Sequence, residues 1–359
     1  MSFYLILFSM FLFYAYSYDG IMISKNRALI NLYNFYTIVL LLIAILFTGF
    51  RYGNIDHDYD SYLKWLTDVR ENFSVYFFQG KDIGFITLYK VTSLFSNNIE
   101  YFFTLVATIS IFAKFIFCRL SFNGKYLGVL LLLVFSRLYL VQEFTQVRVA
   151  IAMGIASCAV LYWCDDRRKT SIILILVSIT FHLSVILIPF LYFIHYNFKS
   201  LDNKKILFSI PIIAFFLSPF SLDLMHFIGG ERIDSYLNGT YAVKKVSLLS
   251  SYYLIRLVLF YFVLLFIYDL ASKIERVFIY FLSCSLFLQA FLSWNDVFSL
   301  RFVEVLGLFD LAAIILPLKY LSTRLKYAYF LMLIIISFLF FYSSLKIVLP
   351  YDNYIFNII

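Results

Sequence analysis

The stretch of sequence that reveals the class of this protein spans residues 127–164 and reads LGVLLLLVFSRLYLVQEFTQVRVAIAMGIASCAVLYWC. It contains two apolar runs, 127–142 and 147–164, which are separated by a few polar residues. Because about 20 apolar residues are enough for one helix to cross a bilayer, the stretch predicts two neighbouring membrane helices. Glu143 and Arg148 lie at the junction between them.

The same pattern continues along the whole chain. Apolar runs occur at residues 2–17, 29–50, 101–118, 127–142, 147–164, 170–194, 206–221, 250–268, 277–293, 302–318 and 327–345. Hydrophobic residues make up 63% and charged residues 14% of the 359 residues, whereas a soluble protein carries about 25% charged residues. We therefore predict an all-α protein, a polytopic transmembrane helix bundle of roughly ten to twelve membrane segments, with a single transmembrane domain over residues 1–359.

The distribution of basic residues predicts the orientation of the chain. In a soluble protein the net charge of +8 would favour a nucleic-acid partner, but here Lys and Arg lie in short connectors between apolar runs. By the positive-inside rule such connectors face the cytoplasm. We therefore expect no nucleic-acid partner and a multi-pass protein of the bacterial inner membrane, whose two longer loops, 51–83 and 222–249, face the periplasm.

The run 170–194 has two interpretations. The basic connectors can all be cytoplasmic only if this run enters and leaves on the same side, as a re-entrant hairpin bent near His182. A simple crossing suits the length of the run better. Irregular backbone is tolerated at membrane depth where it lines a wet cavity, so a mid-run His182 followed by Pro189 favours a re-entrant or broken helix.

The first long loop carries the first candidate site residues. Arg51 directly follows an apolar run, so it either snorkels to the interface or clamps an anion, because its donor fork matches phosphate oxygens. Three acidic residues follow it closely: Asp56, Asp58 and Asp60. They form either a solvated acidic loop or a site in which one carboxylate acts as a general base or orients a sugar hydroxyl. Tyr52 and Tyr62 are further candidates for orienting a substrate.

Three more candidates lie beside apolar runs. Arg148 at a helix start is disfavoured by the helix dipole, so we expect an anionic partner, either Glu143 or a ligand phosphate. His182 is either a packing residue or a general acid or base near neutral pH. Arg301 either pairs with Glu304 three residues on or contacts an anion. We expect these residues, Arg51 and the acidic loop to gather in one outward-facing cavity.

Four short motifs connect these residues to a known family. They are Phe50-Arg51-Tyr52-Gly53, Asp58-Tyr59-Asp60-Ser61-Tyr62, Arg148-Val149-Ala150-Ile151-Ala152 and Phe181-His182-Leu183-Ser184. In order and spacing they resemble the EpsG-like family of membrane polysaccharide polymerases, which are related in role to Wzy-type O-antigen and capsule polymerases. The resemblance covers most of residues 1–200. Asn54-Ile55-Asp56 stands where the family often shows Gly-x-Asp, which leaves open which Asp is equivalent.

The resemblance implies an activity and a set of residue roles. The chain would transfer a growing glycan from undecaprenyl diphosphate onto a lipid-linked repeat unit at the periplasmic face. Arg51, Arg148 and Arg301 would bind the diphosphate, with His182 and either Asp58 or Asp60 as catalytic residues. Candidates for orienting the substrate are Tyr52, Asp56, Tyr62 and Glu143.

The same interpretation sets the expected cofactors, partners and alternatives. We expect no metal, nucleotide or other cofactor. The expected partners are the undecaprenyl-diphosphate-linked oligosaccharide, membrane lipid and a chain-length regulator protein. Two alternatives are a flippase or transporter of lipid-linked oligosaccharide, and a membrane glycosyltransferase that uses a polyprenyl-monophosphate sugar.

Overall fold

The computed structural model describes residues 2–24, 27–51, 53, 58–96, 98–224 and 245–351. Every secondary-structure element within these ranges is helical, which confirms the predicted all-α class. Seven of the described helices are long and apolar enough to cross a membrane, and three shorter apolar helices accompany them. The chain is therefore a multi-pass membrane protein. Tyr52, Asp56 and most of the loop 222–249 lie outside the described residues.

The chain divides into two compact units, which are described separately below. The first comprises Met1–Pro189 together with Thr323–Ile359, and the second comprises Phe190–Ser322. A single transmembrane domain over residues 1–359 stays a prediction.

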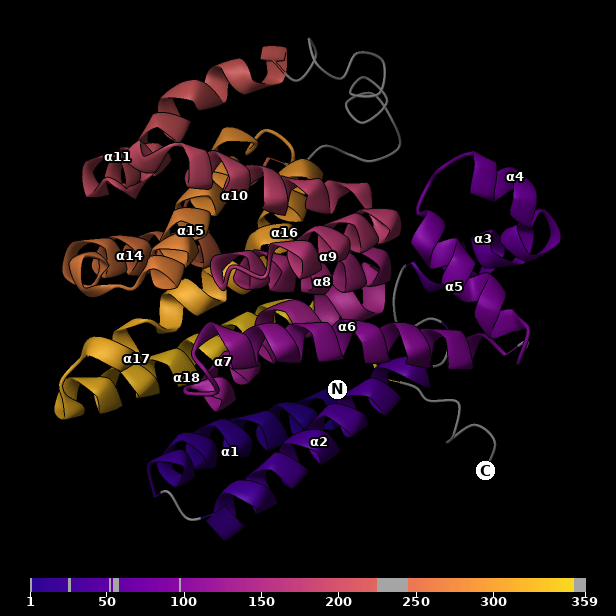
Figure 1. Cartoon of the computed structure of the whole chain (residues 1–359), viewed down its shortest axis with the longest axis horizontal. Coiled ribbons are helices and arrows are strands. Elements are labelled where there is room, and N and C mark those ends of the chain that lie inside the picture. The colour runs from indigo at the N-terminus through magenta and orange to yellow at the C-terminus, as the bar shows by residue number, and fades with distance from the viewer. Residues whose placement is uncertain are drawn as a thin grey trace. The chain divides into compact units, whose positions relative to one another are not determined.

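The first unit holds the N-terminal helices and the C-terminal one (Figure 1). Its elements are α1 (Ser2–Ser24), α2 (Arg27–Gly49), α3 (Tyr59–Glu71), α4 (Phe73–Phe78), α5 (Ile83–Ser93), α6 (Ile99–Ser121), α7 (Leu127–Val134), the π-helical η1 (Phe135–Thr145), α8 (Val147–Cys164), α9 (Arg168–Phe181), the 3-10 turn η2 (Leu183–Ile186) and α18 (Thr323–Leu345). The two apolar runs around residues 127–164 are thus helical, as predicted. Only Gln146 separates the helix η1 from the helix α8.

The segment formed by α7 and η1 is the core of the first unit. A helix that is apolar on all sides is stable only when other elements cover it. The segment Leu127–Thr145 is accordingly buried throughout, and it packs against α1, α6, α8 and α18.

Small residues allow α8 to approach its neighbour α6 closely. A Cβ atom on Gly154 of α8 would lie 2.9 Å from Cβ of Ala113 on α6, too close for an ordinary contact. Short side chains at helix interfaces are typical of membrane bundles. Because α8 also packs along α9, it connects two sides of the unit and places its first turn, with Arg148, between them.

The structure confirms a broken helix near His182. The helix α9 ends at Phe181, and His182 is extended, with φ −163° and ψ 128°. After the turn η2 a new helix, α10 (Leu187–Asn197), begins. Pro189 lies in the first turn of α10, where backbone N–H groups have no partner within the helix, so the proline starts a helix here instead of interrupting one. Whether the run 170–194 is re-entrant stays a prediction.

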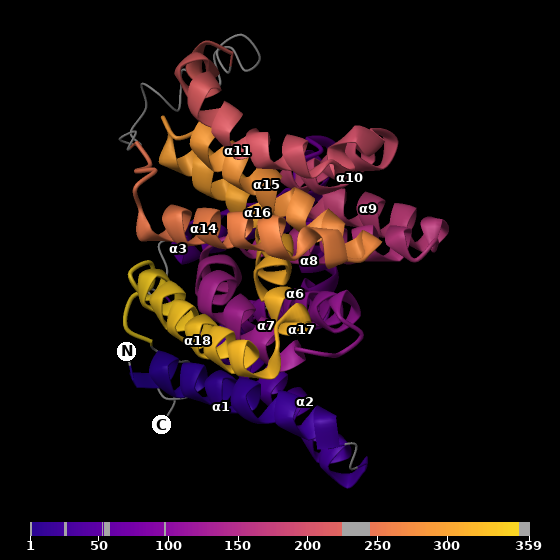
Figure 2. The same cartoon turned by 90° about the vertical axis from the view of Figure 1, so that its left-hand side faces the viewer.

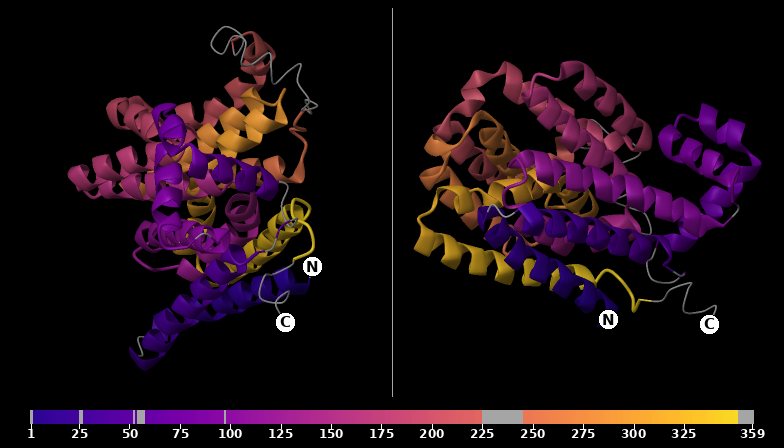
Figure 3. Two further views of the ribbon diagram at one scale, coloured as in Figure 1. Left: turned by 90° about the vertical axis from the view of Figure 1, so that its right-hand side faces the viewer. Right: turned by 60° about the horizontal axis from the view of Figure 1, so that its bottom comes forward.

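The polar stretch between α2 and α6 folds into three short helices, α3, α4 and α5 (Figure 3). In α3 the buried residues are Tyr59, Tyr62, Leu66 and Val69, whose spacing of three and four places them on one helical face. This face packs α3 against α5, and it brings Tyr62 toward the site described below.

The second unit is a bundle in which α15 contacts α11, α14 and α16 (Figure 2). Its elements after α10 are η3 (Lys199–Asp202), α11 (Lys204–Leu217), η4 (Ser218–Phe220), α14 (Ser251–Phe266), η5 (Tyr268–Leu270), α15 (Lys273–Phe291), α16 (Asp296–Ile315) and α17 (Pro317–Tyr320). Ser272 and Glu275 form a capping box at the start of α15, which satisfies N–H groups that a helix start leaves unpaired.

Candidate functional site

Asp82 is the centre of a cluster of charged side chains in the first unit. Its Oδ2 accepts a hydrogen bond from Nη1 of Arg148, and its Oδ1 lies 3.1 Å from Nδ1 of His182. Arg148 and His182 follow Asp82 by 66 and 100 positions in the chain. The fold therefore gathers two of the predicted site residues around a carboxylate that the sequence analysis did not select.

All three residues lie where a helix begins or ends. Asp82 directly precedes α5 and has a left-handed backbone with φ 52°, a conformation that Asp tolerates better than most residues. Arg148 is in the first turn of α8, and His182 follows the last residue of α9. The cluster thus joins the ends of three helices, where the irregular backbone leaves room for polar side chains.

A close approach between α5 and α9 fixes the distance across this cluster. A Cβ atom on Gly84 would lie 2.4 Å from Oγ1 of Thr180 and 3.1 Å from its carbonyl carbon. Only glycine therefore lets α5 come this near to the end of α9. Asp82 and His182 each lie two residues from this contact, so the contact sets their separation.

The cluster combines a buried carboxylate with two partly exposed partners. The side chain of Asp82 is 4% exposed, whereas those of Arg148 and His182 are 26% and 29% exposed. Burial alone would raise the pKa of the Asp82 carboxyl, but the hydrogen bond to His182 and the charge of Arg148 outweigh it, so this pKa lies below its ordinary value. At neutral pH the site is therefore an ionised carboxylate beside a guanidinium and an imidazole that are both partly exposed.

Aromatic side chains hold the guanidinium of Arg148 from another direction. The Arg148 Cζ lies 5.4 Å from the ring centroid of Tyr62 and 5.1 Å from that of Trp65, and Nε donates to the Tyr62 hydroxyl at 3.4 Å. Trp65 in turn stacks on Phe85, with an angle of 4° between the rings. These cation–π contacts connect α3 to the cluster and bring in Tyr62, a predicted orienting residue.

Arg51 lies in a different environment from Arg148. It is 1% exposed, and its guanidinium donates to the backbone carbonyls of Thr48 at 2.9 Å and Phe144 at 3.2 Å. The ring centroid of Phe103 lies 4.5 Å from its Cζ. Arg51 therefore connects the end of α2 to the end of η1, and its predicted contact with a diphosphate stays a prediction.

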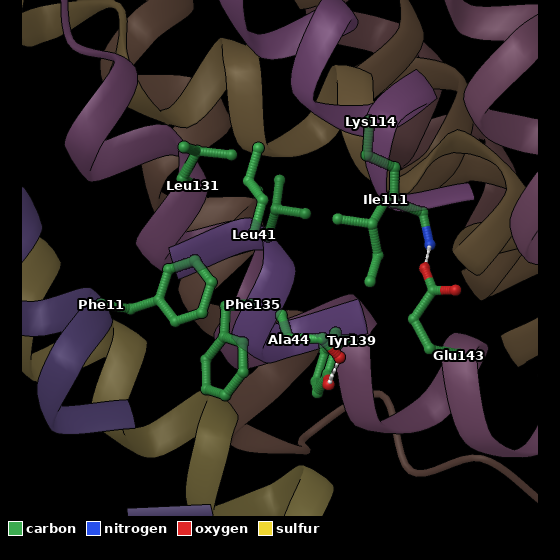
Figure 4. Close-up of a pocket in the computed structure, with 10 residues that line it drawn as sticks. Phe11, Leu41, Ala44, Ile111, Lys114, Leu131, Phe135, Tyr139 and Glu143 are labelled. Atoms are coloured by element: carbon green, nitrogen blue, oxygen red, sulfur yellow. Dashed lines mark hydrogen bonds and ion pairs between the residues drawn. The ribbon is translucent and has the colours of Figure 1, made fainter. Parts of the chain in front are cut away.

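Glu143 is not the partner of Arg148, so that expectation is wrong. Its Oε1 accepts hydrogen bonds from Nζ of Lys114 and, at 2.9 Å, from Oγ of Ser110. Figure 4 shows this ion pair beside a cavity of about 30 Å³ that the aromatic ring of Phe135 also lines. Glu143 is 1% exposed, because the π-helical turn directs it to α6 and not toward the following helix.

The comparisons with known proteins agree with the resemblance found in the sequence. The model of the EpsG family matches residues 33–355. The chain belongs to the EpsG family. It is accordingly a membrane protein of polysaccharide biosynthesis. Comparison with curated proteins and with solved structures gave no match.

The remaining predicted residues of this EpsG-family protein are spread over both units. Asp58 and Asp60 are exposed at the start of α3, and Asp58 is near enough to Tyr62 to act on its hydroxyl electrostatically. Arg301 is exposed on α16 of the second unit. The roles of all three stay predictions.

Sequence reasoning missed two further sets of charged residues in this EpsG-family chain. Asp82 lies in Gly80-Lys81-Asp82-Ile83-Gly84, where the paired glycines signal a tight turn and a close approach. In the second unit Arg256 donates to Asp310 Oδ2, to Ser285 Oγ and to Gln289 Oε1. A charge within an apolar run is a strong signal, and both Arg256 and Asp310 lie within such runs.

Proposed function

We propose that this EpsG-family protein is a polysaccharide polymerase. It transfers a glycan from undecaprenyl diphosphate onto a lipid-linked repeat unit at the periplasmic face of the inner membrane. The observation that supports this most directly is the Arg148–Asp82–His182 cluster, which presents a cation at the start of α8 and an imidazole at the end of α9, both partly exposed.

Arg148 is suited to the diphosphate. Two of its donors are occupied, by Asp82 and by Tyr62, but a guanidinium has five N–H donors, so others remain for phosphate oxygens. The leaving diphosphate gains negative charge as the sugar–oxygen bond breaks, and a fixed cation stabilises this charge more in the transition state than in the ground state. In this proposal Arg51, which is buried against Phe103, supports the site from within the first unit.

The acceptor hydroxyl must lose a proton as it attacks the anomeric carbon. His182 can accept that proton because an imidazole changes charge near neutral pH. Asp58 or Asp60, on the exposed start of α3, would orient the acceptor sugar. Tyr62, whose hydroxyl accepts from Nε of Arg148, would help to orient the bound substrate beside that arginine.

Reconstitution tests the proposal. Purified protein in proteoliposomes is supplied with undecaprenyl-diphosphate-linked repeat units, and the products are separated by gel and mass spectrometry. The wild type should give a ladder of polymers. Arg148→Ala should slow it about 10- to 150-fold, since charge-assisted contacts contribute about 1.5–3 kcal/mol each, and His182→Ala should slow it at least as much. Arg168→Ala, at an arginine whose side chain is 57% exposed, is the matched control.

The outcome also separates the alternatives. Polymer ladders of wild-type intensity from both Arg148→Ala and His182→Ala would contradict the proposed site. In a deletion strain, loss of a polymerase leaves one repeat unit on lipid A, whereas loss of a flippase leaves no surface glycan. Transfer from a polyprenyl-monophosphate sugar, with none from the diphosphate carrier, would instead identify a monophosphate-dependent glycosyltransferase.

A further inference from the structure

The hydrogen bond between Asp82 and His182 determines which ring nitrogen carries a proton. Oδ1 of Asp82 lies 3.1 Å from Nδ1 of His182. The fold lowers the pKa of this carboxyl, so it is ionised at neutral pH and can only accept hydrogen bonds. Nδ1 must therefore be the donor. In a neutral imidazole the other nitrogen, Nε2, then carries the lone pair.

Arg148 holds the carboxylate in this role. The second carboxylate oxygen, Oδ2, accepts from Arg148, so both oxygens of Asp82 are engaged and the group cannot rotate away. Among the residues that the structure describes, only Asp82 is hydrogen-bonded to the His182 ring. The ring is 29% exposed, which leaves Nε2 available to a substrate.

We propose that Asp82 is a positioning residue that keeps His182 in the Nδ1–H tautomer, so that Nε2 is the proton acceptor of the transfer reaction. The catalytic part of this inference rests on the proposed function. Neither the motifs of the sequence nor the family assignment points to Asp82. The inference makes His182, and not Asp58 or Asp60, the general base.

The proposed transfer forms one bond to the anomeric carbon and breaks another. The acceptor hydroxyl oxygen forms a bond to the anomeric carbon of the donor sugar and gives its proton to Nε2 of His182. The bond from the anomeric carbon to the diphosphate oxygen breaks, and its electron pair leaves with undecaprenyl diphosphate. The imidazolium is stabilised by the Asp82 carboxylate, an arrangement that acts through orientation and charge without moving a proton to the carboxylate. Arg148 faces the departing diphosphate.

The tautomer can be measured without any substrate. Protein labelled with ¹⁵N-histidine is studied by solid-state NMR in lipid, at a pH where the ring is neutral, and the His182 signals are assigned by difference from His182→Gln. We expect a protonated Nδ1 and an unprotonated Nε2 in the wild type. Asp82→Asn should lose this single tautomer, since an amide can both donate and accept. The control Asp68→Asn, on the exposed side of α3, should keep it.

Activity supplies the second readout. Asp82→Asn should lower the turnover number about 100-fold or more, within the range of general-base catalysis, with little change in KM for the acceptor. Asp82→Glu should recover part of the loss, because it restores a carboxylate. If Asp82→Asn is unstable because Arg148 loses its partner, the double variant Asp82→Asn/Arg148→Gln removes that unpaired charge and is compared with Arg148→Gln alone.

The two readouts fail in different ways. An unprotonated Nδ1 in the wild type, or full turnover by Asp82→Asn, would overturn the inference while leaving the polymerase proposal intact. A wild-type protein that shows the expected tautomer but makes no polymer would instead contradict the proposed function.

Discussion

Gly84→Ala should impair the site without altering any of its charged residues. Ordinary contacts of a Cβ atom begin at about 3.4 Å, and the new methyl group would lie 2.4 Å from Oγ1 of Thr180. Unless the Thr180 side chain turns away and gives up the hydrogen bond that its hydroxyl donates to the Val177 carbonyl, α5 or the end of α9 must move by about 1 Å. The hydrogen bond between Asp82 and His182, now 3.1 Å long, would then exceed the 3.5 Å limit for such a bond.

Gly84→Ala should cost both stability and activity. Overpacking of this kind costs about 1–3 kcal/mol of unfolding free energy, whereas a misplacement of about 1 Å can slow catalysis about 100-fold. Polymer formation in proteoliposomes measures the loss of activity, and thermal unfolding in detergent measures the loss of stability. A folded variant with a lowered melting point and polymerisation slowed about 100-fold would match the expectation.

A compensating variant makes this test specific. Thr180→Ala removes the hydroxyl that the new methyl group would meet at 2.4 Å, and Thr180 is exposed, so alone it should have little effect. The double variant Gly84→Ala/Thr180→Ala should recover part of the lost activity, because the carbonyl carbon at 3.1 Å remains. Wild-type turnover by Gly84→Ala alone would refute the argument that this close approach sets the site geometry.

Three further predictions concern the buried and ionised groups. Lys114→Met should lower the free energy of unfolding by about 3–5 kcal/mol, because it leaves the Glu143 carboxylate buried without its cation. In a thermal melt the double variant Lys114→Met/Glu143→Gln should lie nearer the wild type. Equal melting points for the single and the double variant would contradict this. Arg256→Met should destabilise the second unit similarly through Asp310, and Arg256→Met/Asp310→Leu should recover most of the loss if the charges alone matter. The lowered pKa of Asp82 contributes stability above the pKa of an unfolded carboxyl, about 3.9, and this contribution is lost as pH falls through the folded value. The melting point should therefore drop below about pH 4, and the part of that drop due to this group should be absent in Asp82→Asn.

Features that depend on local sequence were predictable. The broken helix at His182 follows from a polar residue within an apolar run with a proline shortly after it, and both signals are local. The helices over 127–164 follow from continuous apolar residues. Arg148 and His182 could be selected as site residues because each interrupts an apolar pattern.

Features that depend on long-range packing were not predictable. Asp82 is 100 positions from His182, and although Gly80 and Gly84 mark a tight turn around it, nothing local shows that its carboxylate faces Arg148 and His182. Nearness in sequence makes Glu143 one of the two expected partners of Arg148, yet in the π-helical η1 it pairs with Lys114 instead. Arg51 could not be recognised as buried, because the ring of Phe103 that covers it comes from another helix.

The break at His182 also determines how deep in the bilayer the chemistry would take place. The helix α9 has 14 residues and is therefore about 21 Å long, shorter than the ~30 Å hydrocarbon layer. If its basic start at Arg168 lies at one surface, its end lies well below the opposite headgroups. A sugar hydroxyl delivered to that depth would meet few competing water molecules, which would favour extension of the glycan over hydrolysis of the donor.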